Sequence, residues 1–572
     1  MLKLHPLTTL LLLLLPTQPV IAQTIPSQPD LTLPKPKHPQ LPIPTPPKSP
    51  SIKIQPLPPP NIPEVEPFPG ATITVTQFNF SGNTVFSNAQ LSETLKPYLN
   101  RELTFTELQE TKGVITELYR ENGYITSGAY LPIASNQGFD PKNAIITLNI
   151  IEGTVEEIQV VGADRLQDYI RKRLKHDEDA VFNQEHLKEA MRFLQIDPLL
   201  KTVSIELLPG TKPNTSILKV NAQTQKPFRV SLGLNNHRSP AVGSLEREIT
   251  LSHSDVLGFG DRMIVNYGNT DGSHMFAGEY TLPINTNNGT FAARYNFIDS
   301  NITEKPFNEL DIEGDSSLLE LTYRQPLIRR AKENSIEEFA LGISASRYES
   351  ENSIFGIPFP LSEGTDINGR SEATALRFFQ DWLHSDRKQA ISLHSQLSVG
   401  LDVFSPTLNP NPPDGNFVAW QLQGRWFRYL PHRLQLICRG QLNLADRPLL
   451  GIEQLSLGGN DSVRGYRQNA FLRDNGALGS CELGIPLYTS NKHALQLRPF
   501  VDFGTGWNNE RIDPLAGPIE TSRTLLSVGL GLTYQLKDNL FAQINWGIPL
   551  LSGAEGGSPD NNPVTFSLQW QN

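Results

Sequence analysis

Two short segments in the last third of the chain hold residues that could form a charge-assisted contact. One segment, 458–466, carries Arg464 among several glycines, and the other, 500–504, carries Asp502. In partly desolvated surroundings, a guanidinium and a carboxylate can form a bidentate pair that holds a loop at one depth. The glycines let the loop backbone approach a wall closely. Taken alone, a solvated arginine and an unrelated aspartate would explain these residues at least as well.

The rest of the sequence offers no catalytic or metal-binding pattern. The 11 histidines are scattered, with neither HExxH nor paired metal spacing, and no GxSxG segment occurs. We therefore expect no enzyme activity, no metal and no cofactor. Cys438 and Cys481 are too far apart for a CxxC zinc site. Both cysteines fall on the outward, apolar face of adjacent predicted strands, where two lipid-facing thiols are favoured over a cross-strand disulfide.

The elements that must position these residues are strands with a period of two. Near the C-terminus, for example, Leu526, Val528, Leu530 and Leu532 alternate with small or polar residues. Such alternation is typical of membrane-spanning strands with lipid outside and a wet lumen inside. About 16 segments of this kind begin near residues 228, 245, 261, 275, 290, 315, 336, 371, 388, 417, 433, 477, 494, 524, 538 and 564. The pattern predicts an all-β transmembrane barrel of antiparallel strands over 227–572.

The connections between these segments differ in length. Those at 257–260 and 535–539 are short, whereas others are long and polar: 349–370, 404–416, 446–476 and 547–563. Outer-membrane barrels show this asymmetry. A large soluble β-sandwich or lectin-like domain is the alternative, because its strands also alternate.

Composition agrees with a barrel. The mean hydropathy is only −0.31, which suits a wall in which every second residue is polar. Beyond the N-terminus no apolar run approaches the length of a transmembrane helix. The net charge of −10, with 19% charged residues, excludes the basic footprint of a nucleic-acid-binding protein.

The N-terminal segment contains a predicted signal peptide followed by a predicted spacer. Residues 1–22 have a lysine, a short leucine-rich run and a small-residue end, which predict a cleaved signal peptide rather than an uncleaved anchor. Residues 23–70 form a proline-rich spacer, with 17 prolines among the 44 residues of 26–69. Such a segment should form neither helix nor sheet ladder. A proline-rich peptide ligand is the alternative.

Two small α+β modules are predicted between the spacer and the barrel, at 71–153 and 154–226. Each reads as strand, helix, helix, strand and strand. The first resembles a polypeptide-transport-associated (POTRA) domain, a family whose members bind incoming chains in the periplasm. The residues that carry this resemblance are Gly82, Asn83, Gly123, Tyr124, Glu152 and Gly153. The second module begins with a similar strand and glycine, Val160, Val161 and Gly162.

The two charged segments also resemble paired motifs of one superfamily. Val463, Arg464, Gly465 and Tyr466 are similar to the VRGY motif of outer-membrane secretion and assembly proteins, and Phe500, Asp502 and Gly504 to their F-x-D-x-G strand motif. The resemblance implies that Arg464 and Asp502 face each other inside the barrel.

Two modules before a barrel of about 16 strands match the two-partner secretion transporters (TpsB type, the haemolysin-activator family). The resemblance implies an outer-membrane, monomeric translocator with periplasmic modules, which exports a large β-helical secreted partner and has no nucleic-acid partner. A barrel insertase of the same superfamily is one alternative, and a passive pore or barrel enzyme is another. The family's N-terminal plug helix has no good counterpart in the proline-rich spacer, so whether the pore is plugged stays open.

Overall fold

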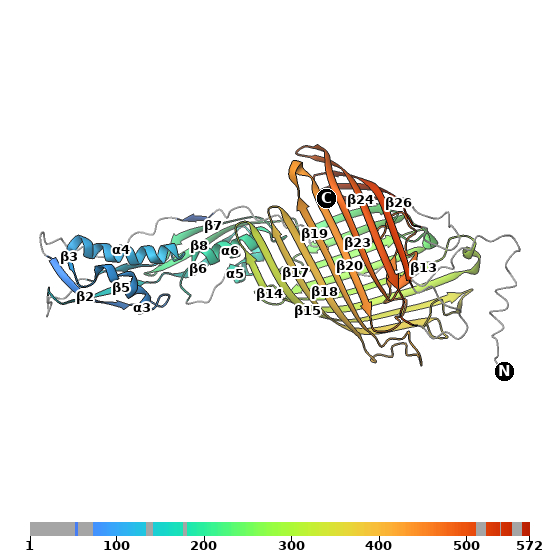
Figure 1. Cartoon of the computed structure of the whole chain (residues 1–572), viewed down its shortest axis with the longest axis horizontal. Coiled ribbons are helices and arrows are strands. Elements are labelled where there is room, and N and C mark those ends of the chain that lie inside the picture. The colour runs from blue at the N-terminus through green and yellow to red at the C-terminus, as the bar shows by residue number, and fades with distance from the viewer. Residues whose placement is uncertain are drawn as a thin grey trace.

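The structure is a computed structural model that describes residues 52–54, 72–132, 141–174, 180–510, 522–537, 539–551 and 563–572. The predicted signal peptide and most of the predicted spacer lie outside the described residues. In Figure 1 two small modules extend in line from one end of a large barrel. We call the end that carries the modules the near end and the opposite one the far end.

The first module packs two helices on a four-stranded sheet of order β3-β2-β5-β4. Its elements are β2 (Thr72–Ser81), α3 (Asn88–Thr94), η1 (Lys96–Tyr98), β3 (Glu102–Thr104), α4 (Phe105–Glu121), β4 (Gly128–Tyr130) and β5 (Ala144–Ile151). Capping boxes start both helices, Ser87 with Gln90 and Thr104 with Glu107. α4 ends before Gly123, whose φ of 88° is the left-handed conformation that glycine adopts freely.

The second module repeats this plan. It contains β6 (Thr154–Val161), η2 (Asp164–Leu166), α5 (Gln167–Leu174), α6 (Gln184–Gln195), β7 (Leu200–Pro209) and β8 (Thr215–Thr224). In both modules the first strand pairs in parallel with the last, and the register shifts at matching places, between Val75 and Gln77 and between Val155 and Glu157. The predicted tandem repeat is therefore confirmed.

One part of the predicted spacer contradicts the expectation that it cannot join a sheet. β1 (Ile52–Ile54) lies parallel to β7, with Ile52 opposite Ile205 and Ile54 opposite Leu207. The stretch between Pro50 and Pro56 is free of proline, so its backbone keeps the amide groups that a ladder needs. Three residues are enough to cover part of an open sheet edge.

Sixteen long antiparallel strands close a barrel in the described part of the chain. They are β9 (Phe228–Asn235), β10 (Glu246–Ser254), β11 (Arg262–Asn269), β12 (Ser273–Pro283), β13 (Thr290–Asn301), β14 (Ile312–Ala331), β15 (Ser335–Ile354), β17 (Arg370–Asp386), β18 (Gln389–Gly400), β19 (Val418–Tyr429), β20 (Gln435–Ala445), β23 (Asn475–Thr489), β24 (His493–Trp507), β25 (Ser522–Leu536), β26 (Leu540–Pro549) and β27 (Val564–Gln571). β27 pairs with β9 and completes the ring. Each strand begins within about three residues of its predicted start.

Shorter elements lie in the connections: η3 (Pro240–Val242), η4 (Phe307–Leu310), β16 (Ile357–Pro358), η5 (Pro431–Arg433), β21 (Leu455–Leu457) and β22 (Phe471–Arg473). β16 pairs only with the end of β15. The connection expected at 349–370 is shorter than predicted, because β15 continues to Ile354.

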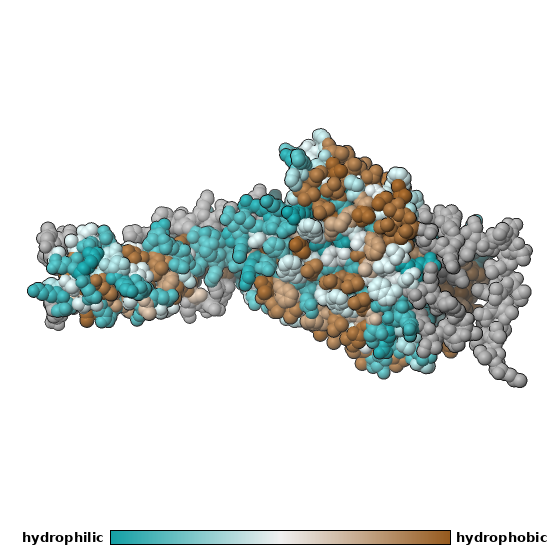
Figure 2. Space-filling model, in the orientation of Figure 1, coloured by the Kyte–Doolittle hydropathy of each residue, from teal (hydrophilic) through white to brown (hydrophobic). Residues whose placement is uncertain are grey.

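The barrel wall is apolar outside and polar inside. On β25, Val528, Leu530 and Leu532 are 37–45% exposed, whereas Ser527 and Thr533, on the other face of the strand, are at most 4% exposed. Figure 2 shows hydrophobic residues over the barrel surface and mainly hydrophilic ones over the modules. A soluble sandwich would bury its apolar face, so the alternative of a sandwich or lectin-like domain is excluded. Among the described residues, no helix is long and apolar enough to cross a membrane.

The second module is bonded to three consecutive near-end turns of the barrel. Arg165 donates to the carbonyl oxygen of Val256 at 2.9 Å, after β10, and Arg173 to the side chain of Asn288 at 2.5 Å, after β12. Arg192 donates to the carbonyl oxygen of Ala331, the last residue of β14, at 2.9 Å. These contacts fix the module beneath the β10–β15 side of the mouth.

The two cysteines are joined, which corrects the expectation of two free thiols. Cys438 on β20 and Cys481 on β23 are directly opposite in the ladder, with Cα atoms 4.2 Å apart, and form a disulfide. Both lie on the outward face, as predicted. The disulfide joins the two strands that flank the connection 446–474.

We expect thiol labelling to detect this bond. In denaturant without reductant the protein should take up no maleimide, and after reduction it should take up two, which a mass measurement counts. A Cys481→Ser variant, which leaves Cys438 without its partner, is the control and should take up one maleimide without reductant. Two adducts on the unreduced wild-type protein would contradict the disulfide.

Candidate functional site

The candidate site is the tip of the connection 446–474, which lies inside the barrel. β21 and β22 pair as an antiparallel ribbon and carry the segment between them inward. Gly458 and Gly459 have φ angles of 100° and 95°, so the chain turns there in a conformation that side chains disfavour. Beyond the turn, Val463, Arg464 and Tyr466 are at most 3% exposed. The loop tip is therefore a packed element rather than a solvated one.

Arg464 meets Asp502 in a bidentate ion pair, as the two motifs predict. Its Nε donates to Oδ2 of Asp502 and its Nη2 to Oδ1, both at 2.7 Å. The backbone amide of Arg464 also donates to Oδ2, at 3.1 Å. Asp502 is fully buried. A carboxylate without water must satisfy its oxygens within the protein, and these three hydrogen bonds do so.

Three further groups of the wall complete the surroundings of the guanidinium. Nη1 of Arg464 donates to Glu482 at 2.7 Å, and Nη2 lies 3.1 Å from the hydroxyl of Ser480. The guanidinium carbon lies 3.5 Å from the ring centre of Phe500, a cation–π distance. All three side chains come from β23 and β24, so two adjacent strands form the cradle.

The other motif residues hold the loop against the wall. Gly465 has a φ of 93°, and a Cβ there would lie 2.8 Å from the carbonyl of Gly547 on β26. A Cβ on Gly504 would likewise lie 2.8 Å from Val463. The hydroxyl of Tyr466 lies 2.9 and 2.8 Å from the carbonyl oxygens of Leu526 and Leu551. All seven predicted motif residues therefore lie where the loop tip packs against the barrel wall.

The loop also contacts the opposite side of the barrel, which the motifs did not predict. Arg467 forms an ion pair with Glu304, in the connection after β13, with one N–O distance of 2.8 Å. β13 and β24 lie eight strands apart in the ring of sixteen, so the loop spans the lumen. Glu453, nearer the start of the connection, accepts from Arg377 on β17 at 2.8 Å. The only sequence signal for these partners is their place on the polar face of a strand or in a connection.

The predicted POTRA residues gather at one corner of the first module. The carboxylate of Glu152 accepts from the amides of Thr84 and Val85, each at 2.9 Å, and from the hydroxyl of Tyr119 at 2.6 Å. Partial burial raises the pKa of Glu152, but the hydrogen bonds from Thr84, Tyr119 and Val85 outweigh it, so the pKa lies below its usual value. This corner joins β2, α4 and β5.

The remaining residues of that signature shape the same corner. A Cβ on Gly82 would lie 2.4 Å from the carbonyl oxygen of Ile150, and one on Gly153 2.5 Å from Thr126, so both sites admit only glycine without rearrangement. Asn83 donates to the carbonyl oxygen of Phe86 at 2.8 Å, and the ring of Tyr124 packs edge-on against Tyr119. A Cβ on Gly123 would lie 2.9 Å from the side chain of Asn183 in the second module.

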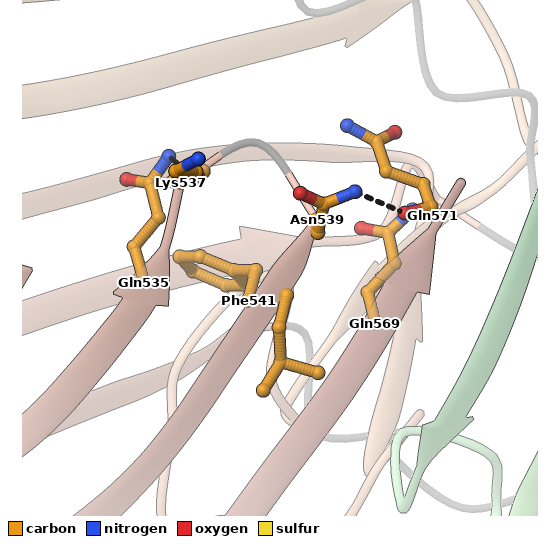
Figure 3. Close-up of a pocket in the computed structure, with 7 residues that line it drawn as sticks. Gln535, Lys537, Asn539, Phe541, Gln569 and Gln571 are labelled. Carbon is orange, nitrogen blue, oxygen red and sulfur yellow. Dashed lines mark hydrogen bonds between the residues drawn. The ribbon is translucent and has the colours of Figure 1, made fainter. Parts of the chain in front are cut away.

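A recess at the near end of β25, β26 and β27 is a weaker candidate. Its volume is about 160 Å³, and Figure 3 shows that it is lined mainly by polar side chains, including Gln535, Asn539 and Gln569. Asn539 bridges to the backbone of Gln571 at 3.0 Å. Within the described residues, no group of three His, Cys, Asp or Glu side chains could hold a metal ion. The loop and its cradle therefore remain the principal site.

Two family models match the chain. The model described as haemolysin secretion/activation protein ShlB/FhaC/HecB covers residues 214–534, more than half of the sequence. The model of the ShlB-type POTRA domain covers residues 73–153, which contain the first module.

Individual relatives are similar over most of their length. The outer membrane transporter CdiB of Escherichia coli O6:K15:H31 is 24% identical over 494 residues, which are 84% of this chain and 80% of that one. The hemolysin transporter protein ShlB of Serratia marcescens is 23% identical over 403 residues, or 69% of each chain.

Solved structures share the fold. CdiB from Escherichia coli superposes with a TM-score of 0.67 at 22% identity, over 90% of this chain and 93% of that one. BamA from Haemophilus ducreyi lacking POTRA domains 1–3 gives 0.51 at 15% identity, over 88% and 100%. The fold is thus shared with both, and more closely with CdiB.

We expect Asp502→Asn to release the loop. The substitution leaves a buried guanidinium without its main counter-charge, and breaking such a pair costs about 3–5 kcal/mol. Trypsin added to the folded protein should then cleave after Arg464 or Arg467, which are protected in the wild type, and mass spectrometry of the fragments would identify the cut. Asp461→Asn is the matched control, because this loop carboxylate is exposed. Equal resistance of Asp502→Asn and wild type would refute the locking role.

A second prediction concerns Glu152→Gln. At pH 7 the substitution should lower the local stability of the corner by about 1–2 kcal/mol, because the hydrogen bonds from Thr84, Val85 and Tyr119 lose a charged acceptor. Hydrogen-exchange protection of segments 84–86 and 119–124 would measure it. Because the folded pKa is depressed, the charge stabilises the fold above about pH 4.5, and this stabilisation is lost as the pH falls through the folded pKa.

The effect of Glu152→Gln should therefore shrink in acid. Glu121→Gln, at an exposed carboxylate at the end of α4, is the control and should change protection little. An effect of Glu152→Gln that is the same at pH 7 and well below pH 4 would mean that the charge is not responsible.

Proposed function

The chain belongs to the family of haemolysin secretion/activation proteins described as ShlB/FhaC/HecB, and we propose that it exports an unfolded partner polypeptide through its barrel. It is an outer-membrane protein, with its N-terminal modules in the periplasm. The near end of the barrel is thus periplasmic and the far end extracellular. The observation that carries the proposal is a polar lumen crossed by a loop that a few ion pairs hold in place.

Docking on the modules is the first proposed step. An incoming chain is recognised by adding a strand to an open sheet edge, where backbone groups pair with any extended peptide. The pairing of β1 with β7 supports this step, because it demonstrates that this edge accepts a strand in parallel register. Recognition through the backbone also suits a partner that arrives unfolded.

Release of the loop is the second proposed step. In the described state the loop bridges the β24 wall and the connection after β13, so a polypeptide cannot pass along the same line. Displacing the loop must break the pairs of Arg464 and of Arg467 together. Asp502 and Glu482 remain in place on the barrel wall, so the ion pairs of Arg464 can form again when the loop returns.

The driving force is the third part of the proposal. The sequence contains no nucleotide-binding motif. We infer that folding of the partner outside the cell draws it outward, because folded segments cannot return through the barrel. The partner class that suits this mechanism is a large, repetitive β-helical protein, which can fold progressively as it emerges.

The assembly-factor alternative has less support. The structure superposes less well on BamA than on CdiB, and the family model that covers more than half of the chain is the secretion family. A passive pore does not need the two modules. The contacts between the second module and the barrel turns therefore favour a function that uses both parts.

The main test is Arg464→Ala. We expect a folded barrel but at least a tenfold lower export of the partner, because the loop loses the contact that resets it. Secretion of the partner into the medium measures export, and heat-modifiable migration on a gel verifies the barrel. Arg447→Ala, an exposed arginine in the same connection, is the control. Unchanged secretion by Arg464→Ala would refute the proposed role of the loop.

Deleting residues 71–226 extends the same experiment to the passive-pore alternative. A transporter that depends on its modules should lose export completely while the barrel still folds. Export that survives the deletion would favour a passive pore. The partner itself can be identified as the protein that disappears from the medium of a deletion strain.

A further inference from the structure

The periplasmic turns that the second module leaves uncovered are basic. Six exposed cations lie there, and we call them the basic rim: Arg387, Lys388, Arg428, Arg433, Lys492 and Lys537. They belong to the turns, or adjoining strand ends, of β17–β18, β19–β20, β23–β24 and β25–β26. Asp386 is the one carboxylate among the described residues of these turns, and it accepts the backbone amides of Lys388 and Gln389. Asp538, beside Lys537, lies outside the described residues.

An aromatic row lies on the outward wall next to the basic rim. It consists of Trp382, Trp426, Tyr488, Tyr534 and Trp570, one each from β17, β19, β23, β25 and β27. Trp426 faces outward, since its ladder partner is Cys438 on the lipid side. Aromatic side chains in such a row mark the interface between acyl chains and headgroups. The basic rim therefore lies at the depth of the lipid headgroups.

Arg428 links the two sets directly. It is two residues from Trp426 on the same outward face of β19, and its guanidinium carbon is 6.0 Å from the Trp426 ring centre. A cation in that position cannot face the lumen. Its exposed nitrogens are available to an acceptor in the headgroup layer.

Two far-end connections of the same strands have the opposite charge. The connection 401–417 contains Asp402 and Asp414 and neither lysine nor arginine, and the connection 355–369 contains Glu363 and Asp366 and no cation. Each near-end turn from β17–β18 to β25–β26, by contrast, carries at least one lysine or arginine.

We propose that the basic rim binds anionic phospholipid headgroups, of the phosphatidylglycerol class, in the periplasmic leaflet of the outer membrane. Phosphate oxygens accept hydrogen bonds from guanidinium and ammonium groups, and each cation near an anionic surface raises affinity by about fivefold. The bound lipids hold the β17–β27 side of the barrel at a fixed depth, as the second module supports the β10–β15 side. The proposal depends on the outer-membrane location but not on export.

The test uses the full chain in vesicles that contain brominated phosphatidylglycerol or brominated phosphatidylcholine. Bromine quenches tryptophan fluorescence on contact, and three tryptophans lie in the aromatic row. We expect at least a fivefold preference for phosphatidylglycerol in the wild type at low salt. A variant with Arg387→Gln, Arg428→Gln, Arg433→Gln and Lys492→Gln should lower it to less than twofold. Molar salt should weaken the wild-type preference, because it screens exposed charges.

A matched control removes four exposed cations from the modules: Lys96→Gln, Arg120→Gln, Lys201→Gln and Lys212→Gln. It should keep the wild-type preference. Absence of a preference in the wild type would overturn the proposal, and so would an equal loss in both variants. If the rim variant keeps its lipid preference but no longer binds an acidic peptide that the wild type binds, the rim serves a polypeptide instead.

Discussion

A charged side chain that has left water must meet opposite charge within the protein, and this constraint organises the interior of the barrel. Arg464 is buried in the lumen, and only the carboxylates of Asp502 and Glu482 make its position tolerable. Their strands must therefore be adjacent and in a fixed register. The disulfide between β20 and β23 also fixes the register of the two strands that flank the connection 446–474. A loop held by directional pairs has one well-defined resting place.

The wall makes such a loop possible. Because every second residue points to lipid, half of the side chains of each strand contact the membrane. The other half face the lumen and are available for polar contacts. The lumen thus presents serine, glutamate, aspartate and arginine at short intervals, and a loop with a few arginines finds partners on opposite sides. Purely hydrophobic packing would hold it with less directional selectivity.

Much of this could be predicted from the sequence, for definable reasons. The strand starts are predictable to within a few residues because period-two alternation is sharp, for example at Phe228 and Leu526. The Arg464–Asp502 contact is predictable because both motifs are intact. Glu482 and Ser480 could not be found, since partners across strands depend on register. The disulfide is not predictable for the same reason, because alternation gives the face on which a cysteine lies but not its neighbour across the strands. β1 has only three residues, too few to show a pattern.

The three bonded turns beneath the barrel have a mechanical consequence. Contacts through Arg165, Arg173 and Arg192 fall on successive turns around the mouth, and three separate attachment points remove rotation as well as translation. The first module is joined in turn, with Gln184 donating its amide to the carbonyl of Gly123 at 2.8 Å. In Figure 1 the two modules form one continuous arm that ends at the barrel. A polypeptide that docks on the second module would therefore approach the pore from the β10–β15 side of the mouth.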